Sequence, residues 1–205
     1  MTKLKICGMR TPEDLDVCRK ADYLGFVVLS DSPRCLKVDR ARELMPMCDV
    51  RKVAVTTERR PEALEDMVRR LEPDVLQLHT PLDRELLSKT ADLGVPLWGM
   101  LPVRRDAEVD LPALSYLEAL VLDSPGPRAG GNGMTHDWSL SRNLRQKVEP
   151  LPVVLAGGLD AGNVQRAIET VGPFAVDISS GAEENGRKDF RKVTMIMEAI
   201  RGDEE

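Results

Sequence analysis

The feature of this chain that most restricts its fold is an alternation of short apolar runs with amphipathic segments, which repeats eight times in 205 residues. The apolar runs have the length of strands, and several, such as PVVLA at 152–156, are apolar throughout. Such runs are typical of parallel strands, which are covered on both faces. We expect strands at 3–7, 23–29, 51–56, 74–79, 96–101, 118–123, 152–156 and 174–179. We expect helices at 11–21, 38–46, 60–71, 83–94, 110–117, 138–148, 160–171 and 189–200, the fifth being the weakest.

Eight successive strand–helix pairs with no linker between halves predict an α/β protein, a parallel eight-stranded (β/α)8 TIM barrel formed by one domain over residues 1–205. A doubly wound open sheet is the alternative. In a barrel of this kind the active site lies at the carboxyl ends of the strands. The residues that directly follow each strand are therefore the candidates for function.

Composition narrows the class of protein. The formal net charge of −5 lacks the basic excess typical of nucleic-acid-binding proteins, and no apolar run approaches the roughly 18 residues of a membrane span. The segment MTKLKICGMR also lacks the apolar core of a signal peptide, so we expect a cytoplasmic protein. The four cysteines include no CxxC pair and there are two histidines, so we expect reduced thiols and no metal site.

Two strand ends carry a group that can move a proton. Cys7 ends the first run and directly precedes Gly8, and Asp123 ends the sixth run. A thiol can act as a base if its pKa is lowered, and a carboxyl can act as an acid if burial raises its pKa. Each residue also has an ordinary structural explanation, because free cysteine packs well in cores and aspartate favours turns. Taken singly, the structural explanation is the stronger one for both.

Arg34 and His79 also follow strands. Arg34, in the segment SPR, is by default a solvated charge, but an arginine at the barrel mouth could hold a carboxylate through two parallel hydrogen bonds. His79 ends the fourth strand, and a lone histidine there is more often a core or rim residue than a catalyst.

Three glycine-rich segments follow the last strands. AGGL at 156–159 and SSG at 179–181 come after the seventh and eighth strands, where barrels often bind phosphate through backbone N–H groups. Each motif is weak alone, but their presence on adjacent strand ends predicts a phosphate site. GPRAGGNG at 126–133 is either a flexible connection or a loop that closes over a ligand.

The order of these segments is similar to that of a known family. KICGMRTPED at 5–14, SPR at 32–34, LQLH at 76–79, LAGGL at 155–159 and VDISSGAEENGRKD at 176–189 resemble the phosphoribosylanthranilate isomerase family of tryptophan biosynthesis. LDS, GGNG and DW, between residues 122 and 138, extend the resemblance over nearly the whole chain.

The resemblance implies an isomerase that converts N-(5-phosphoribosyl)anthranilate to 1-(2-carboxyphenylamino)-1-deoxyribulose 5-phosphate by an Amadori rearrangement. It implies no cofactor and no metal, a small phosphorylated substrate, and a monomer or homodimer. Cys7 would be the general base at C2′, and Asp123 the general acid at the ring oxygen. Arg34 would hold the anthranilate carboxylate, and His79 and Asp177 would lie at the substrate. The residues that would cradle the phosphate are Gly157, Gly158, Ser179, Ser180 and Gly181.

Two alternatives remain. One is a related phosphate-binding barrel isomerase, acting on the histidine-pathway aminoaldose or on both substrates. The other is a barrel that binds a phosphorylated ligand without turnover. Departures from the family pattern at Thr56, Thr57, Thr80 and His136 flank the expected pocket, so they bear on substrate fit and rate more than on reaction type.

Overall fold

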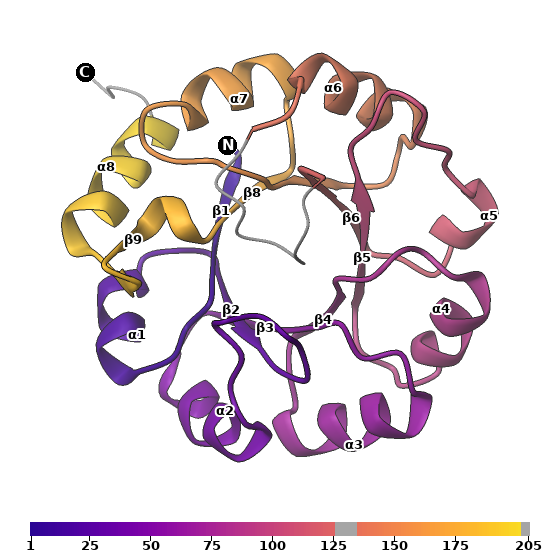
Figure 1. The fold of residues 1–205 in the computed structure, drawn as a ribbon, viewed down its shortest axis with the longest axis horizontal. Coiled ribbons are helices and arrows are strands. Elements are labelled where there is room, and N and C mark those ends of the chain that lie inside the picture. The colour runs from indigo at the N-terminus through magenta and orange to yellow at the C-terminus, as the bar shows by residue number, and fades with distance from the viewer. Residues whose placement is uncertain (126–134, 202–205) are drawn as a thin grey trace.

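A computed structural model describes residues 1–125 and 135–201, and within them eight parallel strands close into a barrel surrounded by eight helices (Figure 1). β1 pairs with both β2 and β8, so the closed barrel is confirmed and the open doubly wound sheet is excluded. The strands of the barrel are β1 (Lys3–Cys7), β2 (Tyr23–Val27), β3 (Arg51–Thr56), β4 (Val75–Leu78), β5 (Leu97–Pro102), β6 (Ala119–Asp123), β7 (Val153–Leu155) and β8 (Ala175–Ile178).

Each strand is followed by a helix that covers the outside of the barrel. The α-helices are α1 (Pro12–Cys18), α2 (Val38–Leu44), α3 (Pro61–Leu71), α4 (Arg84–Ala91), α5 (Leu111–Leu114), α6 (Trp138–Lys147), α7 (Val164–Val171) and α8 (Phe190–Arg201). Short 3-10 turns lie at η1 (Met45–Met47) and η2 (Ser180–Ala182), and β9 (Glu183–Glu184) pairs with β10 (Arg187–Lys188). None of the described helices is both long and apolar enough to cross a membrane.

The predicted elements are present, with some differences at their ends. The helix expected from residue 160 begins at Val164, because residues 160–163 form a turn in which the Asn163 amide oxygen accepts from the Asp160 N–H. The weak fifth helix is a single turn, and the second strand ends at Val27, two residues before the predicted end. Residues 126–133, the third glycine-rich segment, lie outside the described residues.

The start of α1 shows how local sequence sets an element. Thr11 is the N-cap and Pro12 the first helical residue, as the sequence predicts. The Thr11 side chain accepts from the Asp14 N–H, and the Asp14 carboxylate accepts in return from the Thr11 N–H. This reciprocal cap turns the chain directly after the strand end that carries Cys7.

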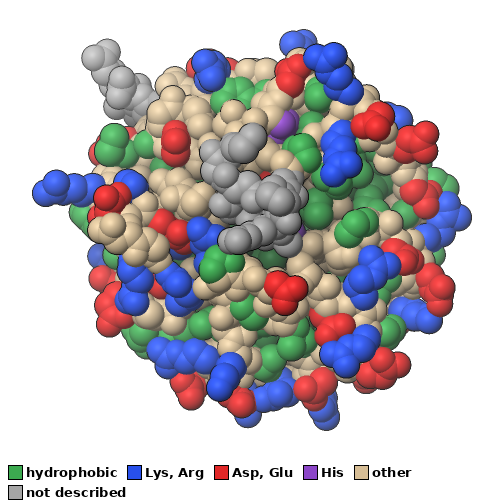
Figure 2. All heavy atoms as spheres, in the orientation of Figure 1, with side chains coloured by type: hydrophobic (Ala, Val, Ile, Leu, Met, Phe, Trp, Pro, Cys, Tyr) green, Lys and Arg blue, Asp and Glu red, His purple; other side chains and the backbone are tan. Residues whose placement is uncertain are grey.

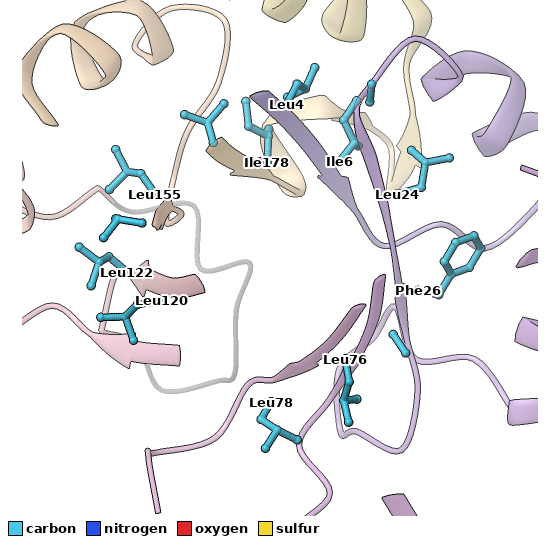
Figure 3. Close-up of a cluster of buried hydrophobic side chains, with 14 of the residues drawn as sticks. Leu4, Ile6, Leu24, Phe26, Leu76, Leu78, Leu120, Leu122, Leu155 and Ile178 are labelled. Carbon is cyan, nitrogen blue, oxygen red and sulfur yellow. The ribbon is translucent and has the colours of Figure 1, made fainter. Parts of the chain in front are cut away.

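Alternate residues of each strand point outward to the helices or inward to the barrel axis. Figure 3 shows outward side chains such as Leu4, Ile6 and Leu120 between the barrel and its helices. The inward apolar set, which fills the barrel, comprises Cys7, Tyr23, Val27, Val53, Val55, Val75, Trp98, Ala119, Val121, Val154, Ala156 and Ala175. This alternation decides which strand-end side chains can reach a ligand.

Charged side chains of both signs are interspersed around the periphery of the face shown in Figure 2. No single sign dominates that face, in keeping with the formal net charge of −5.

Candidate active site

A pocket lies at the carboxyl ends of the strands. Strand alternation turns Cys7, His79 and Asp123 inward at this end of the barrel, and all three line the pocket. Nine of the ten sequence-predicted site residues line it: Cys7, Arg34, His79, Asp123, Gly157, Gly158, Asp177, Ser179 and Ser180. The tenth, Gly181, does not line this pocket.

Two glycines explain the local sequence around Cys7. The N–H groups of Gly8 and Met9 both donate to the carbonyl of Gly25, which ties the end of β1 to β2. Gly8 has a φ of +94°, and a Cβ there would lie 2.5 Å from Cδ of Arg34. A Cβ on Gly25 would lie 2.8 Å from Sγ of Cys7. Glycine at these two positions therefore leaves room for the thiol and the guanidinium.

The thiol of Cys7 is buried among charges. Burial, with a smaller contribution from Asp177, raises its pKa above the ordinary value, and the ammonium groups of Lys5 and Lys188 offset only part of that rise. Nζ of Lys188 donates to the carbonyl of Cys7 at 2.6 Å and to the carbonyl of Ser179 at 3.1 Å. Lys188 thus links the ends of β1 and β8 beneath the pocket. Sequence reasoning missed both lysines, although Lys5 stands two residues before Cys7 and therefore on the same side of the strand.

The guanidinium of Arg34 already holds a carboxylate of the protein. Its Nε and Nη2 donate to the two carboxylate oxygens of Glu183, at 2.7 and 2.6 Å. Glu183 also accepts from Nζ of Lys188 at 2.9 Å. Burial by itself raises the pKa of Glu183, but Arg34 and Lys188 overcome this and lower it to about 2. Within the described residues Nη1 of Arg34 has no acceptor, so one edge of the fork is left for a ligand.

Asp123 is fixed by two contacts at the end of β6, a strand on the other side of the barrel from β1 (Figure 1). Its Oδ1 accepts from the N–H of Ser124 at 2.7 Å, and its Oδ2 lies 3.3 Å from Nε2 of His79. The Asp123 residue is 7% exposed, in contact with the pocket. His79 therefore supports a neighbouring carboxyl group in addition to facing the pocket.

The loops after β7 and β8 have the geometry expected of an anion site. Gly157 and Gly158 have φ values of +91° and +66°, so their backbone follows a path that other residues rarely adopt. Within the described part of the chain, no group accepts from the N–H of Gly158 or Ser180. Donors of this kind at a glycine-rich turn suit a phosphate.

Gly181 has a packing role beside the phosphate-binding role that the sequence suggests, and the latter stays a prediction. A Cβ at this position would lie 2.0 Å from the carbonyl oxygen of Leu159. Gly181 therefore allows the loops after β7 and β8 to approach each other closely. It shapes the anion site from behind and does not face the pocket.

The departures from the family pattern fall into two groups. Thr56 and Thr57 line the pocket, and both hydroxyls donate to the carbonyl of Leu29, at 3.1 and 3.4 Å. Thr80 does not line the pocket, and its hydroxyl accepts from Nη1 of Arg59 at 2.9 Å.

His136 contacts the residue that follows Asp123. Its Nδ1 is 2.9 Å from Oγ of Ser124, and its Nε2 is 2.5 Å from Oγ of Ser141. Burial lowers the pKa of His136. The imidazole therefore connects the residue after Asp123 to α6.

A family model, related sequences and solved structures all match this chain to the same kind of protein. The family model for N-(5'-phosphoribosyl)anthranilate isomerase matches residues 4–199. An N-(5'-phosphoribosyl)anthranilate isomerase of Methanocella arvoryzae is 39% identical over 212 residues, covering 98% of this chain and 99% of that protein. The structure of phosphoribosyl anthranilate isomerase from Thermotoga maritima superposes with a TM-score of 0.85 at 33% identity, covering 98% and 100%. A further isomerase structure, with reduced 1-(O-carboxyphenylamino)-1-deoxyribulose 5-phosphate bound, gives a TM-score of 0.82 at 32% identity, with 98% and 100% coverage.

Proposed function

The chain belongs to the N-(5'-phosphoribosyl)anthranilate isomerase family, and from that premise we infer that it catalyses this isomerisation in tryptophan biosynthesis. The substrate is N-(5-phosphoribosyl)anthranilate and the product is 1-(2-carboxyphenylamino)-1-deoxyribulose 5-phosphate. The observation that carries the proposal is a single pocket that holds a thiol, a carboxyl and an anion site together. We propose that the protein acts in the cytoplasm, as a monomer or homodimer.

Asp123 acts first, as the general acid. The anthranilate nitrogen forms a double bond to C1′ as the bond from C1′ to the ring oxygen breaks. Asp123 gives its proton to that oxygen, so the furanose ring opens to an iminium. The contacts of its carboxyl with Ser124 and His79 fix its direction. A positioned acid of this kind typically contributes about 10² to 10⁴ in rate.

Cys7 acts second, as the general base. The iminium acidifies the C2′ proton, and the Cys7 thiolate removes it. The electrons of the C–H bond form a double bond between C1′ and C2′, and those of the C=N bond return to nitrogen. The resulting enol gives the ketone at C2′ when a proton returns to C1′. One acid and one base therefore suffice for the reaction.

The remaining pocket residues bind the two ends of the substrate. The N–H groups of Gly158 and Ser180 and the hydroxyl groups after β8 suit the phosphate. Arg34 offers Nη1 to the anthranilate carboxylate while Glu183 holds the other edge of its fork. Oδ1 of Asp177 is buried and, among the described residues, has no donor, so it can accept from a ribose hydroxyl.

The test is a fluorescence assay. Phosphoribosylanthranilate, made in the cuvette from anthranilate and phosphoribosyl pyrophosphate by a separate transferase, is fluorescent, and its signal should fall when the purified protein is added. The histidine-pathway aminoaldose, offered to the same preparation, tests the breadth of the substrate range. Product binding without turnover by a folded preparation would show a ligand-binding barrel and refute the proposal.

A further inference from the structure

Lys5 is a buried cation that the mechanism above does not use. Its side chain is 0% exposed inside the barrel, and its Nζ lies 2.6 Å from Oδ2 of Asp177, which is 9% exposed. The two residues are register partners on β1 and β8. Burying an ammonium costs several kcal/mol even after relaxation, and an apolar pair of similar size often serves stability as well or better. The ion pair at this place therefore calls for a functional explanation.

The position of Lys5 relative to Cys7 suggests one. The residues are two apart on β1, so both side chains point into the barrel, one layer apart. Cys7 lies above, at the pocket, and Lys5 lies beneath it, away from water. A charge in a water-excluded site acts on its neighbour far more strongly than it would on the surface.

The charges that face Cys7 do not cancel. Three cationic side chains lie near the thiol, those of Lys5, Arg34 and Lys188. Two carboxylates form ion pairs with them, those of Asp177 and Glu183. Asp14, a further carboxylate, accepts from the backbone N–H groups of Arg10, Thr11 and Lys188 and lies 3.9 Å from Nε of Arg187. One positive charge is therefore left without a carboxylate, and a buried cation is stabilised by a nearby anion.

A thiolate at Cys7 supplies that anion. Burial opposes it and keeps the pKa of Cys7 above its ordinary value, and of the charges that lower this pKa Lys5 has the largest effect. Burial also acts to lower the pKa of Lys5, but Asp177 and Cys7 together raise it, so the ammonium stays charged. Asp177 thus holds Lys5 in place through a hydrogen bond, and its carboxylate competes with the ionised sulfur for the charge of the ammonium.

We propose that Lys5 is a positioning residue for the isomerisation: its buried ammonium, held by Asp177, stabilises the thiolate of Cys7 that removes the C2′ proton. The proposal rests on the role of Cys7 given under the proposed function. It differs from a purely structural role, in which Lys5 and Asp177 only fill the barrel and the ionisation of Cys7 is independent of them.

The test measures the ionisation of Cys7 without substrate. The rate of alkylation by iodoacetamide is followed from pH 6 to 10 by mass spectrometry of the peptide that contains Cys7. Lys5→Met should move the midpoint of the alkylation profile to higher pH and reduce the rate at pH 7 by at least about 10-fold, the factor that one pKa unit represents. In Asp177→Asn the amide oxygen can still accept from Nζ of Lys5, so the ammonium stays in place, and the loss of the competing negative charge should move the midpoint to lower pH.

A matched control uses a lysine–aspartate pair elsewhere. Lys52 and Asp74 pair at 3.1 Å near the amino ends of β3 and β4, away from the pocket, so Lys52→Met should leave the midpoint unchanged. A profile that has not levelled off by pH 10 is extended until it does, and the plateau rates correct for access to the sulfur. The kcat of Lys5→Met should be reduced about 10-fold at pH 7 and should recover as the pH rises, which a structural defect would not do.

Unchanged midpoints in Lys5→Met and Asp177→Asn, or shifts in the same direction, would overturn the proposal. If Lys5→Met does not fold, Asp177→Asn decides alone, and an unshifted midpoint there refutes it. The experiment distinguishes failure of this proposal from failure of the proposed function. If the alkylation midpoints of Lys5→Met and Asp177→Asn shift in opposite directions but the wild-type protein does not convert phosphoribosylanthranilate, the effect of Lys5 on the thiol is supported and the proposed function is refuted.

Discussion

The two ends of the barrel are built from the same eight strands and serve different purposes. At the amino end two large aromatic side chains fill the barrel: Tyr23 and Trp98 are 1% and 0% exposed, with ring centroids 5.1 Å apart. Lys3 and Arg51 lie over the Tyr23 ring, at 5.7 and 5.2 Å from its centroid. At the carboxyl end the inward side chains are small or polar, and a pocket remains.

Single strands show the change from one end to the other. β6 begins at Ala119 inside the barrel and ends at Asp123 in the pocket, and β1 begins at Lys3 and ends at Cys7. Every second side chain of a strand faces inward. The size of the inward side chain at each level decides whether that level of the barrel is filled or open. Substitutions at the carboxyl end should therefore affect turnover, and those at the amino end should affect stability.

The largest effect is expected at Cys7. Cys7→Ser keeps the size of the side chain but replaces the base with a hydroxyl that does not ionise near neutral pH. Turnover should fall by about 10⁴, the upper end of the range for loss of an acid or base, with little change in melting temperature. Loss of phosphoribosylanthranilate fluorescence measures the first and thermal unfolding the second. A large drop in melting temperature with turnover intact would assign Cys7 to packing.

Asp123→Asn comes next. The amide can still accept from the Ser124 N–H, but it has no proton to give to the ring oxygen. We expect kcat to fall by about 10² to 10³ while the affinity for product, measured by calorimetry, stays close to that of the wild type. Near-normal kcat would remove Asp123 from the chemistry.

Trp98 tests the opposite end. Trp98→Ala leaves a cavity in the filled part of the barrel and should cost about 3–5 kcal/mol of unfolding free energy, measured by urea denaturation. The kcat of the folded fraction should be unchanged. Phe190→Ala is the matched control, because Phe190 is 67% exposed and its loss should cost less than about 0.5 kcal/mol. A defect in kcat for Trp98→Ala would break the division between the two ends.

The smallest effect concerns acid stability. The pKa of Glu183 lies at about 2 in the folded protein, below its ordinary value of 4.5, because of Arg34 and Lys188. A carboxyl whose pKa is lower in the folded than in the unfolded protein stabilises the fold at pH values above the unfolded-state pKa. This stabilisation is lost as the pH falls through the folded-state pKa. Glu183→Gln should therefore cost about 2 kcal/mol at pH 7, and the difference from wild type should vanish between pH 4.5 and 2. An equal difference at both ends of that range would contradict the assignment.

The fold and most of the pocket could be predicted from the sequence because their signals are local. Apolar runs and helical periodicity gave the strand and helix positions, and the rule that barrels act at their carboxyl ends selected Cys7 and Asp123. The ion pairs of the site could not be predicted in this way. Arg34 and Glu183 are 149 residues apart, and Lys5 and Asp177 are 172 apart, so only the closed barrel brings each pair together.

Gly181 shows a second limit. A glycine after a strand suggests access for an anion, but the same residue type also serves the close approach of two backbones. Only the position of the Leu159 carbonyl distinguishes the two. The role of Thr80 was hidden for a similar reason, since its partner Arg59 belongs to the preceding loop.

The most direct test of the account is a crystal structure of this protein with the reduced product analogue bound. We predict that the phosphate lies against the N–H groups of Gly158 and Ser180. We also predict that C2′ lies about 3.5 Å from Sγ of Cys7, the separation of reacting atoms in a near-attack geometry. Asp123 should face the oxygen released from the ring. A ligand bound elsewhere, or one whose phosphate lies on the Thr57 side of the pocket with C2′ remote from Cys7, would contradict the assignment of the site.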